Sequence, residues 1–420
     1  MIDSFLHELG FSASSLDKCL YKRHDALLIL FCDDLRIGAP PLVLASLRDA
    51  FFNKFGITTA SGSRFLGMDT VYDLPRGYLK ISMESYIVTT VERFANFDLT
   101  RGVPYREIVG CLLWITLCVM GPELLRVKDL ARRSNSYTEK DFQDALEVLA
   151  RIDKRKHHGI VIFRSAAGKE ICPASSREGL IDLPSLSDDI GIAICPDDNE
   201  LRQKSLCQAS TLGRIPVSSM TNQTFQYTVD DASELDIPRV VLAINDRYNL
   251  IVYGDASFAI GDTKQSVSGF VVYLNGTPLL WGSLKQTIVV DSSCSAEYVA
   301  ASIGCKQLLH AENMIGFLGF SCPKPYRQYT DSMACYHIAT NPAKLGNVRH
   351  LHIRYHLVRC YVTLGDIEMV FCITEHMVAD LFTKIVTAAQ DSRLCVRFYS
   401  LYPGSDALVL YAPISVSKLL

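Results

Sequence analysis

The sequence predicts an α/β protein with two structured parts. Its 420 residues are 49% hydrophobic and 21% charged, which is an ordinary balance for a globular chain with room for roughly two or three domains. After residue 248, three strand-like stretches are followed by a long helical stretch and then by alternating strands and helices. Strands first and alternation later predict a mixed sheet with helices on its faces.

The first part, residues 1–165, is predicted to be an α+β unit. The stretch ALLILFCDDLRIGAP, residues 26–40, is an apolar run that ends in Asp33 and Asp34 and predicts a β-hairpin around them. Helical spacing follows in residues 41–56. Two adjacent carboxylates at a strand end are how polymerases hold divalent metals, so this hairpin is a candidate functional motif.

A less regular segment separates this unit from the second part. Residues 166–248 are rich in Ser, Asp and Pro with little periodicity, so we interpret them as a linker or an irregular insertion. The second domain is predicted over residues 249–388, and the tail, 389–420, has no assignment. Five strands of one sheet are expected in these stretches: 249–261, 266–276, 277–290, 326–332 and 367–374. The expected helices of this domain include 295–319 and 377–386.

Charge and cysteine usage limit the function classes. The net charge of −3 gives no global signal for nucleic acid, so any such binding must be local. The 14 cysteines include no pair with the CxxC spacing of zinc or redox sites. With no signal peptide at the start, reduced thiols in a cytoplasmic or nuclear protein are expected. The longest apolar run, residues 108–121, is shorter than the ~20 residues of a membrane span, so we expect a buried helix and no membrane partner.

Four acids of the second domain lie at predicted strand ends and helix starts. They are Asp255, Glu297, Asp331 and Asp380. Each one alone would more often be a helix cap or a dipole partner, so the argument depends on all four together. Several carboxylates around one cleft suit Mg²⁺ or Mn²⁺, and two such ions can cleave a phosphodiester. We expect the first three to converge, with Asp380 at the rim.

Residues 249–386 resemble the ribonuclease H domain of copia-type retrotransposon polyproteins. The resemblance is carried, in the family's order and spacing, by VYGDAS, SVSGFVVYLNGTPLLWGSLKQ, SSCSAEYVA, YTDSMA, RHLHIRYHLVR and VADLFTK. It implies an RNase H-like five-stranded mixed sheet, and it makes the four acids the catalytic ligands of two Mg²⁺ or Mn²⁺ ions. The chain departs from the family's pattern at Ser257 and Phe258, neither of which is one of these acids.

The resemblance extends to the N-terminal part. The stretch SSLDKCLYKRHDALLILFCDDLRIGA resembles the segment around the family's Tyr-Val-Asp-Asp polymerase motif. The stretches RFLGMDTVYD, YREIVGCLLWIT and ALEVLARIDKRKHHGI resemble the rest of palm, thumb and connection. In the family a third carboxylate lies many tens of residues upstream, whereas 32 residues precede Asp33 here. Asp33 and Asp34 are therefore interpreted as a vestigial motif. We expect no reverse transcription by this chain alone, and the missing upstream part of the polyprotein is a candidate partner.

A basic helix face is the candidate nucleic-acid contact. Arg349, Arg354 and Arg359 lie in RHLHIRYHLVR, and Lys285 could extend the patch. A plain solvated face explains these residues equally well. Zinc could use His352 and His356 of the same stretch, but no third ligand is evident. His376, four residues before Asp380, could assist proton transfer, although a surface loop histidine is the simpler interpretation.

The function that these patterns favour is metal-dependent cleavage of the RNA strand of an RNA–DNA hybrid by a retrotransposon-derived protein. The alternative is a non-enzymatic retroelement remnant that binds nucleic acid weakly or not at all. A DNA-joining enzyme on the same fold would usually carry three acids and a different order of motifs.

Overall fold

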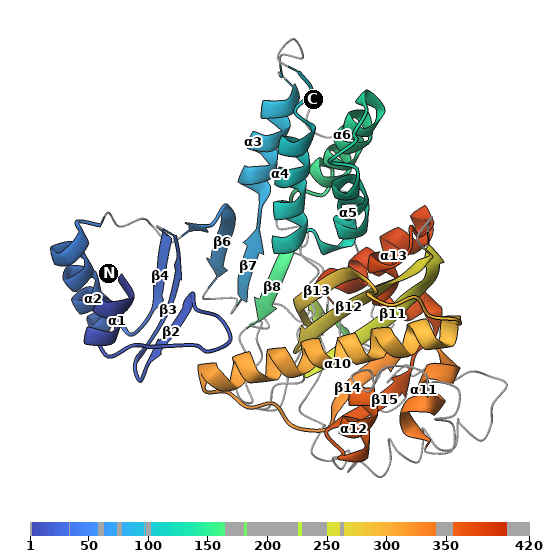
Figure 1. The fold of residues 1–420 in the computed structure, drawn as a ribbon. Helices are drawn as coiled ribbons and strands as arrows, with labels where there is room; N and C mark the ends of the chain where they lie inside the picture. The colour runs from blue at the N-terminus through green and yellow to red at the C-terminus, as the bar shows by residue number, and fades with distance from the viewer. Residues whose placement is uncertain are drawn as a thin grey trace.

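The computed structural model describes residues 2–32, 34–57, 63–73, 78–95, 97, 102–163, 180–182, 226–228, 250–260, 264–341 and 356–400. Figure 1 shows an N-terminal lobe, a helical middle part and a C-terminal part built on a sheet. None of the described helices combines the length and the apolar character needed to cross a bilayer.

The N-terminal lobe is a four-stranded antiparallel sheet covered by two helices (Figure 1). Its elements are α1 (Ile2–Glu8), β1 (Ser12–Ala13), β2 (Leu20–Arg23), β3 (Ala26–Phe31), β4 (Asp34–Gly38) and α2 (Pro41–Phe55). Leu6, Leu28 and Phe51 lie in a small core that the sheet and both helices share. The predicted hairpin is present as β3 and β4, which pair from Leu27 opposite Gly38 to Phe31 opposite Asp34.

The middle part combines a second antiparallel sheet with four α-helices. Its elements are β5 (Arg64–Phe65), β6 (Met68–Asp73), β7 (Tyr78–Ser82), α3 (Glu84–Ala95), α4 (Tyr105–Cys118), η2 (Gly121–Glu123), α5 (Leu124–Arg132), α6 (Glu139–Asp153) and β8 (Gly159–Phe163). The apolar run predicted to be a buried helix forms most of α4, whose Ile108, Leu112 and Ile115 are fully buried. At α6 the Thr138 and Asp141 side chains cap each other's backbone N–H groups, which fixes where the helix starts.

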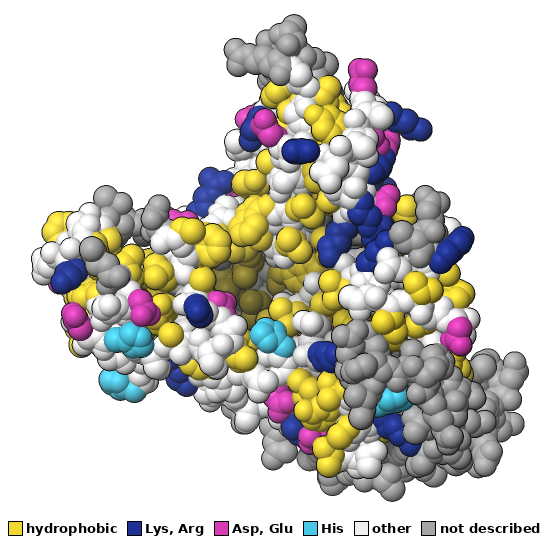
Figure 2. All heavy atoms as spheres, viewed as in Figure 1, with side chains coloured by type: hydrophobic (Ala, Val, Ile, Leu, Met, Phe, Trp, Pro, Cys, Tyr) yellow, Lys and Arg dark blue, Asp and Glu magenta, His cyan; other side chains and the backbone are white. Residues whose placement is uncertain are grey.

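The surface between the lobe and the middle part is apolar. Figure 2 shows a hollow there in which hydrophobic side chains gather. Exposed large hydrophobics on the strands of the two sheets include Ile29 on β3, Val71 on β6 and Ile162 on β8. A nucleic-acid backbone is gripped by cationic and polar groups, so the hollow itself offers little to a polyanion.

The C-terminal part is a mixed five-stranded sheet, as the resemblance implied, and its strands lie in the order β13-β12-β11-β14-β15. Its elements are β11 (Leu250–Ile260), β12 (Gln265–Leu274), β13 (Thr277–Lys285), α10 (Ser293–Leu318), β14 (Tyr326–Thr330), α11 (Met333–Thr340), α12 (Leu357–Thr363), β15 (Ile367–Phe371), η5 (Thr374–His376), η6 (Val378–Phe382) and α13 (Ala388–Ser400). Strands β11, β12 and β13 pair antiparallel, whereas β11, β14 and β15 pair parallel. The fold class is therefore α/β.

The two faces of this sheet belong to two different cores. Along β11, Leu250 and Val252 pack with α10 and α11, whereas Ile251 and Tyr253 point the other way. That second face joins a hydrophobic cluster that also includes the helices of the middle part and α13. The predicted domain boundaries at residues 165 and 249 stay predictions. This hydrophobic cluster contains residues from both sides of that interval.

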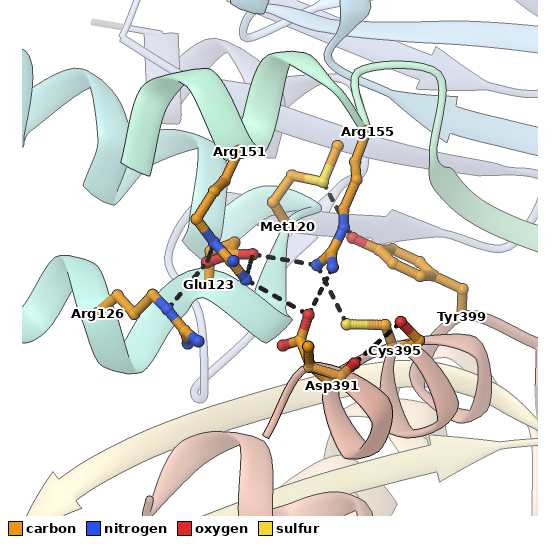
Figure 3. Close-up of polar contacts among 10 residues, drawn as sticks. Met120, Glu123, Arg126, Arg151, Arg155, Asp391, Cys395 and Tyr399 are labelled. Atoms are coloured by element: carbon orange, nitrogen blue, oxygen red, sulfur yellow. Dashed lines mark hydrogen bonds and ion pairs between the residues drawn. The ribbon is translucent and has the colours of Figure 1, made fainter. Parts of the chain in front are cut away.

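Helix α13 lies in the tail that has no assignment from the sequence, and it holds the C-terminal part against the middle part. Figure 3 shows Glu123 of η2 and Asp391 of α13 on either side of two arginines of the α6 region. Glu123 accepts from Arg151 and Arg155 at 3.0 Å each, and Asp391 accepts from Arg155 at 2.5 Å. Glu123 and Asp391 are both buried, so this ion network lies inside the joint between the two parts.

The N-terminal lobe also reaches the C-terminal part. Lys22 of β2 donates from Nζ to the carbonyl oxygen of Phe317 at 3.0 Å, at the last turn of α10. A cation at a helix C-terminus is favourable because the unpaired carbonyls there carry partial negative charge. Of the segment 166–248, the structure describes a two-stranded ladder of β9 (Leu180–Asp182) and β10 (Gln226–Thr228). The rest of that segment and the tail from residue 401 lie outside the described residues.

Candidate metal centre

Three of the four predicted acids meet at one point. Oxygen atoms of Asp255, Glu297 and Asp331 all lie within 4.8 Å of one another. The sheet explains the first pair: Tyr253 lies opposite Tyr329 in the parallel ladder of β11 and β14, so two residues further on Asp255 approaches Asp331. Glu297 comes from the second turn of α10, which Ser292 starts by capping the N–H of Ser295.

Asp380 lies outside the group of three and is buried, and its predicted place at the rim of the metal site stays a prediction. It lies on η6, a short 3₁₀ turn, where the sequence predicted the start of an α-helix. Its exposed fraction is 1%, the same as that of Asp255, so it is as deeply buried as the central acid. Burial and the charge of Asp255 raise the pKa of Asp380 to about 8.

A glycine makes room for this arrangement. Gly269 of β12 lies opposite Asp255 in the antiparallel ladder, and η6 packs onto the sheet at that point. A Cβ atom on Gly269 would lie 2.7 Å from the carbonyl oxygen of Ala379 and 2.7 Å from the Thr383 side chain. The missing side chain therefore lets the backbone that carries Asp380 approach Asp255.

Gly269→Ala should push η6 away from the sheet, because backbone atoms stand where the new methyl group would lie. We expect a loss of about 1–3 kcal/mol in the free energy of unfolding, as for other overpacked sites. Weaker Mg²⁺ binding should accompany it, measured by titration calorimetry. Gly316→Ala on α10 is the matched control, because nothing lies within 4 Å of its Cβ position. Equal stability and Mg²⁺ affinity in the two variants would contradict the argument.

Three polar side chains that sequence analysis did not select hold the acids in place. The Thr383 hydroxyl donates to Asp255 Oδ2, and the Thr374 hydroxyl donates to Asp331 Oδ2 at 2.7 Å. Lys384 Nζ lies 2.9 Å from Asp380 Oδ1. Thr383 and Lys384 stand within the VADLFTK segment, so their closeness to Asp380 in sequence was an available signal. Thr374 had none, because it lies in η5, the short 3₁₀ turn after β15.

The acids share one electrostatic environment. Burial raises the pKa of Asp255 above its usual range, and the Lys384 ammonium opposes that rise. Burial, followed by the charges of Asp255 and Asp331, raises the pKa of Glu297 to about 10. Desolvation and like charges both disfavour the ionised form of Glu297, so this residue favours its protonated form at neutral pH in the metal-free protein.

The metal-free protein should lose stability as the pH rises. Asp380 and Glu297 have folded-state pKa values of about 8 and about 10, and their unfolded values are about 4. Between the unfolded and folded pKa values, the folded state binds more protons than the unfolded state. The contribution of these two groups to stability is therefore greatest below about pH 4 and is lost as the pH rises to about 8 for Asp380 and about 10 for Glu297. Thermal unfolding in EDTA from pH 6 to 9 measures this fall. Asp380→Asn should flatten it, and an equally steep fall in that variant would contradict the assignment.

The residues fit a hard divalent cation. Among the described residues, Asp380 Oδ2 and Glu297 Oε2 have no hydrogen-bond partner, although both atoms are buried. Buried polar atoms are normally satisfied, so these oxygens are suited to a further ligand. The donor set consists of carboxylate oxygens only, which is the preference of Mg²⁺ and Mn²⁺ rather than of zinc.

The polymerase-like motif is present only as a hairpin. Asp34 begins β4 and is exposed, and Asp33 lies outside the described residues. Within the described part of the chain, Asp255, Glu297 and Asp331 are the acids that form a group of three metal-ligating residues, and Asp34 is not among them.

The candidate nucleic-acid contacts are placed in part. Arg349 and Arg354 lie outside the described residues, as does His352. Arg359 of α12 donates from Nη1 to the carbonyl oxygens of Ile338 at 2.8 Å and Asn341 at 3.1 Å. It thereby caps the C-terminal end of α11, a structural use that the sequence did not indicate. The predicted contact of Arg359 and Lys285 with nucleic acid stays a prediction.

The histidines at 356 and 376 lie in different elements and make different contacts. His356 Nδ1 lies 3.2 Å from the hydroxyl of the buried Tyr298, and His376 ends η5. Neither belongs to a three-residue metal-ligating group within the described parts of the chain. The zinc hypothesis and the proton-transfer hypothesis for these histidines stay predictions.

Comparison with known proteins finds relatives over part of the chain. No protein-family profile matches the sequence. The chain is 32% identical over 147 residues to the "Retrovirus-related Pol polyprotein from transposon RE2" of Arabidopsis thaliana, and 31% identical over 147 residues to that from transposon RE1. It is 29% identical over 135 residues to that from transposon TNT 1-94 of Nicotiana tabacum. These matches cover 34%, 34% and 32% of this chain and 10% of each relative. The predicted resemblance to copia-type polyproteins is confirmed over about a third of the chain.

Two solved structures show weak similarity. One is the N-terminal RNase H domain of a Mycobacterium tuberculosis protein, with a TM-score of 0.23 and 15% identity over 34% of this chain and 95% of that one. The other is the protease-reverse transcriptase of prototype foamy virus, with a TM-score of 0.22 and 10% identity over 90% of this chain and 59% of that one. Scores this low carry no argument, and the fold assignment depends on the sheet topology above.

Proposed function

We propose that this chain is a divalent-metal-dependent nuclease that cleaves the RNA strand of RNA–DNA hybrids. The observation that carries the proposal is the meeting of Asp255, Glu297 and Asp331 within 4.8 Å at a point where the sheet and the helix α10 converge. Similarity to retrovirus-related Pol polyproteins supports an origin in a retroelement.

Asp255, Glu297, Asp331 and Asp380 would hold two Mg²⁺ or Mn²⁺ ions. Bound there, the ions would activate a water and stabilise the leaving oxygen of the phosphodiester. The chain's own part is to keep four carboxylates in one place, with the hydroxyls of Thr383 and Thr374 fixing two of them. The water oxygen forms a bond to phosphorus, the bond to the 3′-oxygen breaks, and the products end in a 3′-hydroxyl and a 5′-phosphate.

The proposed partner is an RNA–DNA hybrid met in the cytoplasm or the nucleus, and the upstream part of a polyprotein is a further proposed partner. With a net charge of −3, the chain must hold the hybrid through local contacts, for which Lys285 and the arginines at 349, 354 and 359 are the candidates. Backbone contacts position a duplex without reading bases, so little sequence preference is expected. The RNA strand is distinguished by its 2′-hydroxyl groups.

The test is a cleavage assay with the purified chain. A hybrid labelled on the RNA strand, a DNA duplex of the same sequence and an RNA duplex are each incubated with Mg²⁺, with Mn²⁺ and with EDTA. Cleavage confined to the RNA of the hybrid, dependent on the cation and leaving 3′-hydroxyl ends, is the expected result. No cleavage with either cation would favour a non-enzymatic remnant. Joining of DNA ends would instead favour a DNA-joining enzyme on the same fold.

A further inference from the structure

Lys384 places a positive charge directly against the carboxylates. Its ammonium lies 2.9 Å from Asp380 Oδ1, and its backbone N–H donates to the Asp380 carbonyl oxygen at 3.1 Å, so one turn of chain fixes the pair. The Asp380 side chain is 1% exposed. Asp380 Oδ2 has no hydrogen-bond partner among the described residues, whereas Oδ1 is paired with the ammonium.

The lysine faces more than one acid. Its ammonium interacts with Asp255 and Asp331 as well as with Asp380. An acidic cluster of this kind is costly to fold alone, since like charges repel and burial removes them from water. A single ammonium at this point offsets part of that cost. It does so where a divalent cation would also have to bind, since both cations would use the carboxylate of Asp380.

We propose that Lys384 is a built-in counter-ion that occupies the carboxylate cluster in the metal-free protein and that a divalent cation must displace. This inference rests on the proposed function, because it takes the cluster to be a cation site. The side chain is able to leave: 41% of it is exposed, and a lysine ammonium sits on a flexible four-carbon stem. The ammonium and a metal ion repel each other at one oxygen, so the two compete for Asp380.

Replacing the lysine tests separately its effect on metal-free stability and its effect on Mg²⁺ binding. Lys384→Met keeps most of the apolar stem and removes the charge. In EDTA at pH 8 its melting temperature should fall below that of the wild type, because Asp380 loses its partner. Mg²⁺ should bind it about fivefold more tightly or better, since that factor corresponds to only about 1 kcal/mol of removed charge repulsion. Titration calorimetry measures the affinity directly and does not depend on catalysis.

Two further variants show whether the charge at this position, rather than its packing, produces the effects. Lys140→Met removes the same charge from an exposed position on α6 and should change neither the metal-free melting temperature nor the Mg²⁺ affinity. Lys384→Arg keeps the charge and should stay close to the wild type in metal-free stability. If Lys384→Met does not fold without metal, the double variant with Asp380→Asn should recover folding, because the charge that needed neutralising is gone.

The outcomes distinguish this inference from the proposed function. Unchanged metal-free stability in Lys384→Met, or Mg²⁺ affinity no tighter than that of the wild type, would overturn the competition. Failure of the double variant to recover folding would overturn it as well, because the lysine would then act through packing. A wild type that neither binds Mg²⁺ nor cleaves a hybrid would overturn the proposed function. Lower metal-free stability of Lys384→Met would in that case still support the counter-ion role.

Discussion

Asp255→Asn should reduce hybrid cleavage by about a thousandfold or more while raising the stability of the metal-free protein. Asp255 is the central member of the cluster: it is 1% exposed, it meets Glu297 and Asp331, and it interacts with Asp380. Loss of a metal ligand there removes several kcal/mol of transition-state stabilisation, and about 1.4 kcal/mol corresponds to a factor of ten in rate. Initial cleavage rates at saturating Mg²⁺ measure the effect.

The stability of the same variant gives an independent readout. The amide is nearly the same size as the carboxyl group and can still accept from Thr383, so the local packing should survive. It carries no charge, so the desolvation and the repulsion that raise the pKa of Asp255 disappear. The melting temperature in EDTA should therefore rise. Asp366→Asn, at an ion pair with Lys324, is the control and should cleave normally. Undiminished cleavage by Asp255→Asn would mean that another site carries the activity.

Glu123→Ala should lower the free energy of unfolding by about 3–5 kcal/mol, the usual cost of removing one partner from a buried ion network. Glu123 is 1% exposed and accepts from Arg151 and Arg155, which it shares with Asp391 of α13. Without it, two guanidinium groups face a single carboxylate inside the joint between the middle and C-terminal parts. The loss should appear as earlier separation of α13 from the middle part in urea.

Tryptophan fluorescence is suited to this measurement, because Trp114 and Trp281 are the two tryptophans of the chain and both pack against the shared cluster. Trp281 lies 5.2 Å from the Phe398 ring of α13. Asp129→Ala is the matched control on α5, because it removes an exposed pair with Arg132 and should cost less than about 1 kcal/mol. Equal losses in the two variants would show that the buried network contributes no more than a surface pair.

The sequence predicted the C-terminal sheet because its strands alternate or run apolar over their whole length and are bounded by turns. Asp255, Glu297 and Asp331 could be predicted as a group from the ordered motifs that carry them. The prediction that Asp255 ends a strand was wrong, because it lies in the middle of β11, which continues to Ile260. Asp380 was found by the same argument, but its burial was not. That burial depends on Gly269, whose importance arises from a contact between segments far apart in the chain.

Several features escaped prediction because they exist only in tertiary contact. The apolar face of α13 packs against Trp281 and Gly121, which are distant in the sequence and could not be identified as its partners. Glu123 and Arg155 form a buried ion pair, although in the sequence they cannot be distinguished from surface charges. Arg359 was predicted to belong to a basic face, although its Nη1 caps α11. Periodicity indicates which face of an element is buried, but not which partner buries it.

Cutting the chain just before β11 would remove the helices that pack against one face of the C-terminal sheet. Tyr253, Tyr273 and Phe398 are buried in a cluster shared with α4 and α5, so the fragment would expose the apolar surface that these two helices cover. Soluble proteins rarely tolerate such a patch, so a fragment that begins at residue 249 should self-associate or precipitate even with every metal-ligating acid present. The unit to be purified for the cleavage assay should therefore include the helices that precede β11.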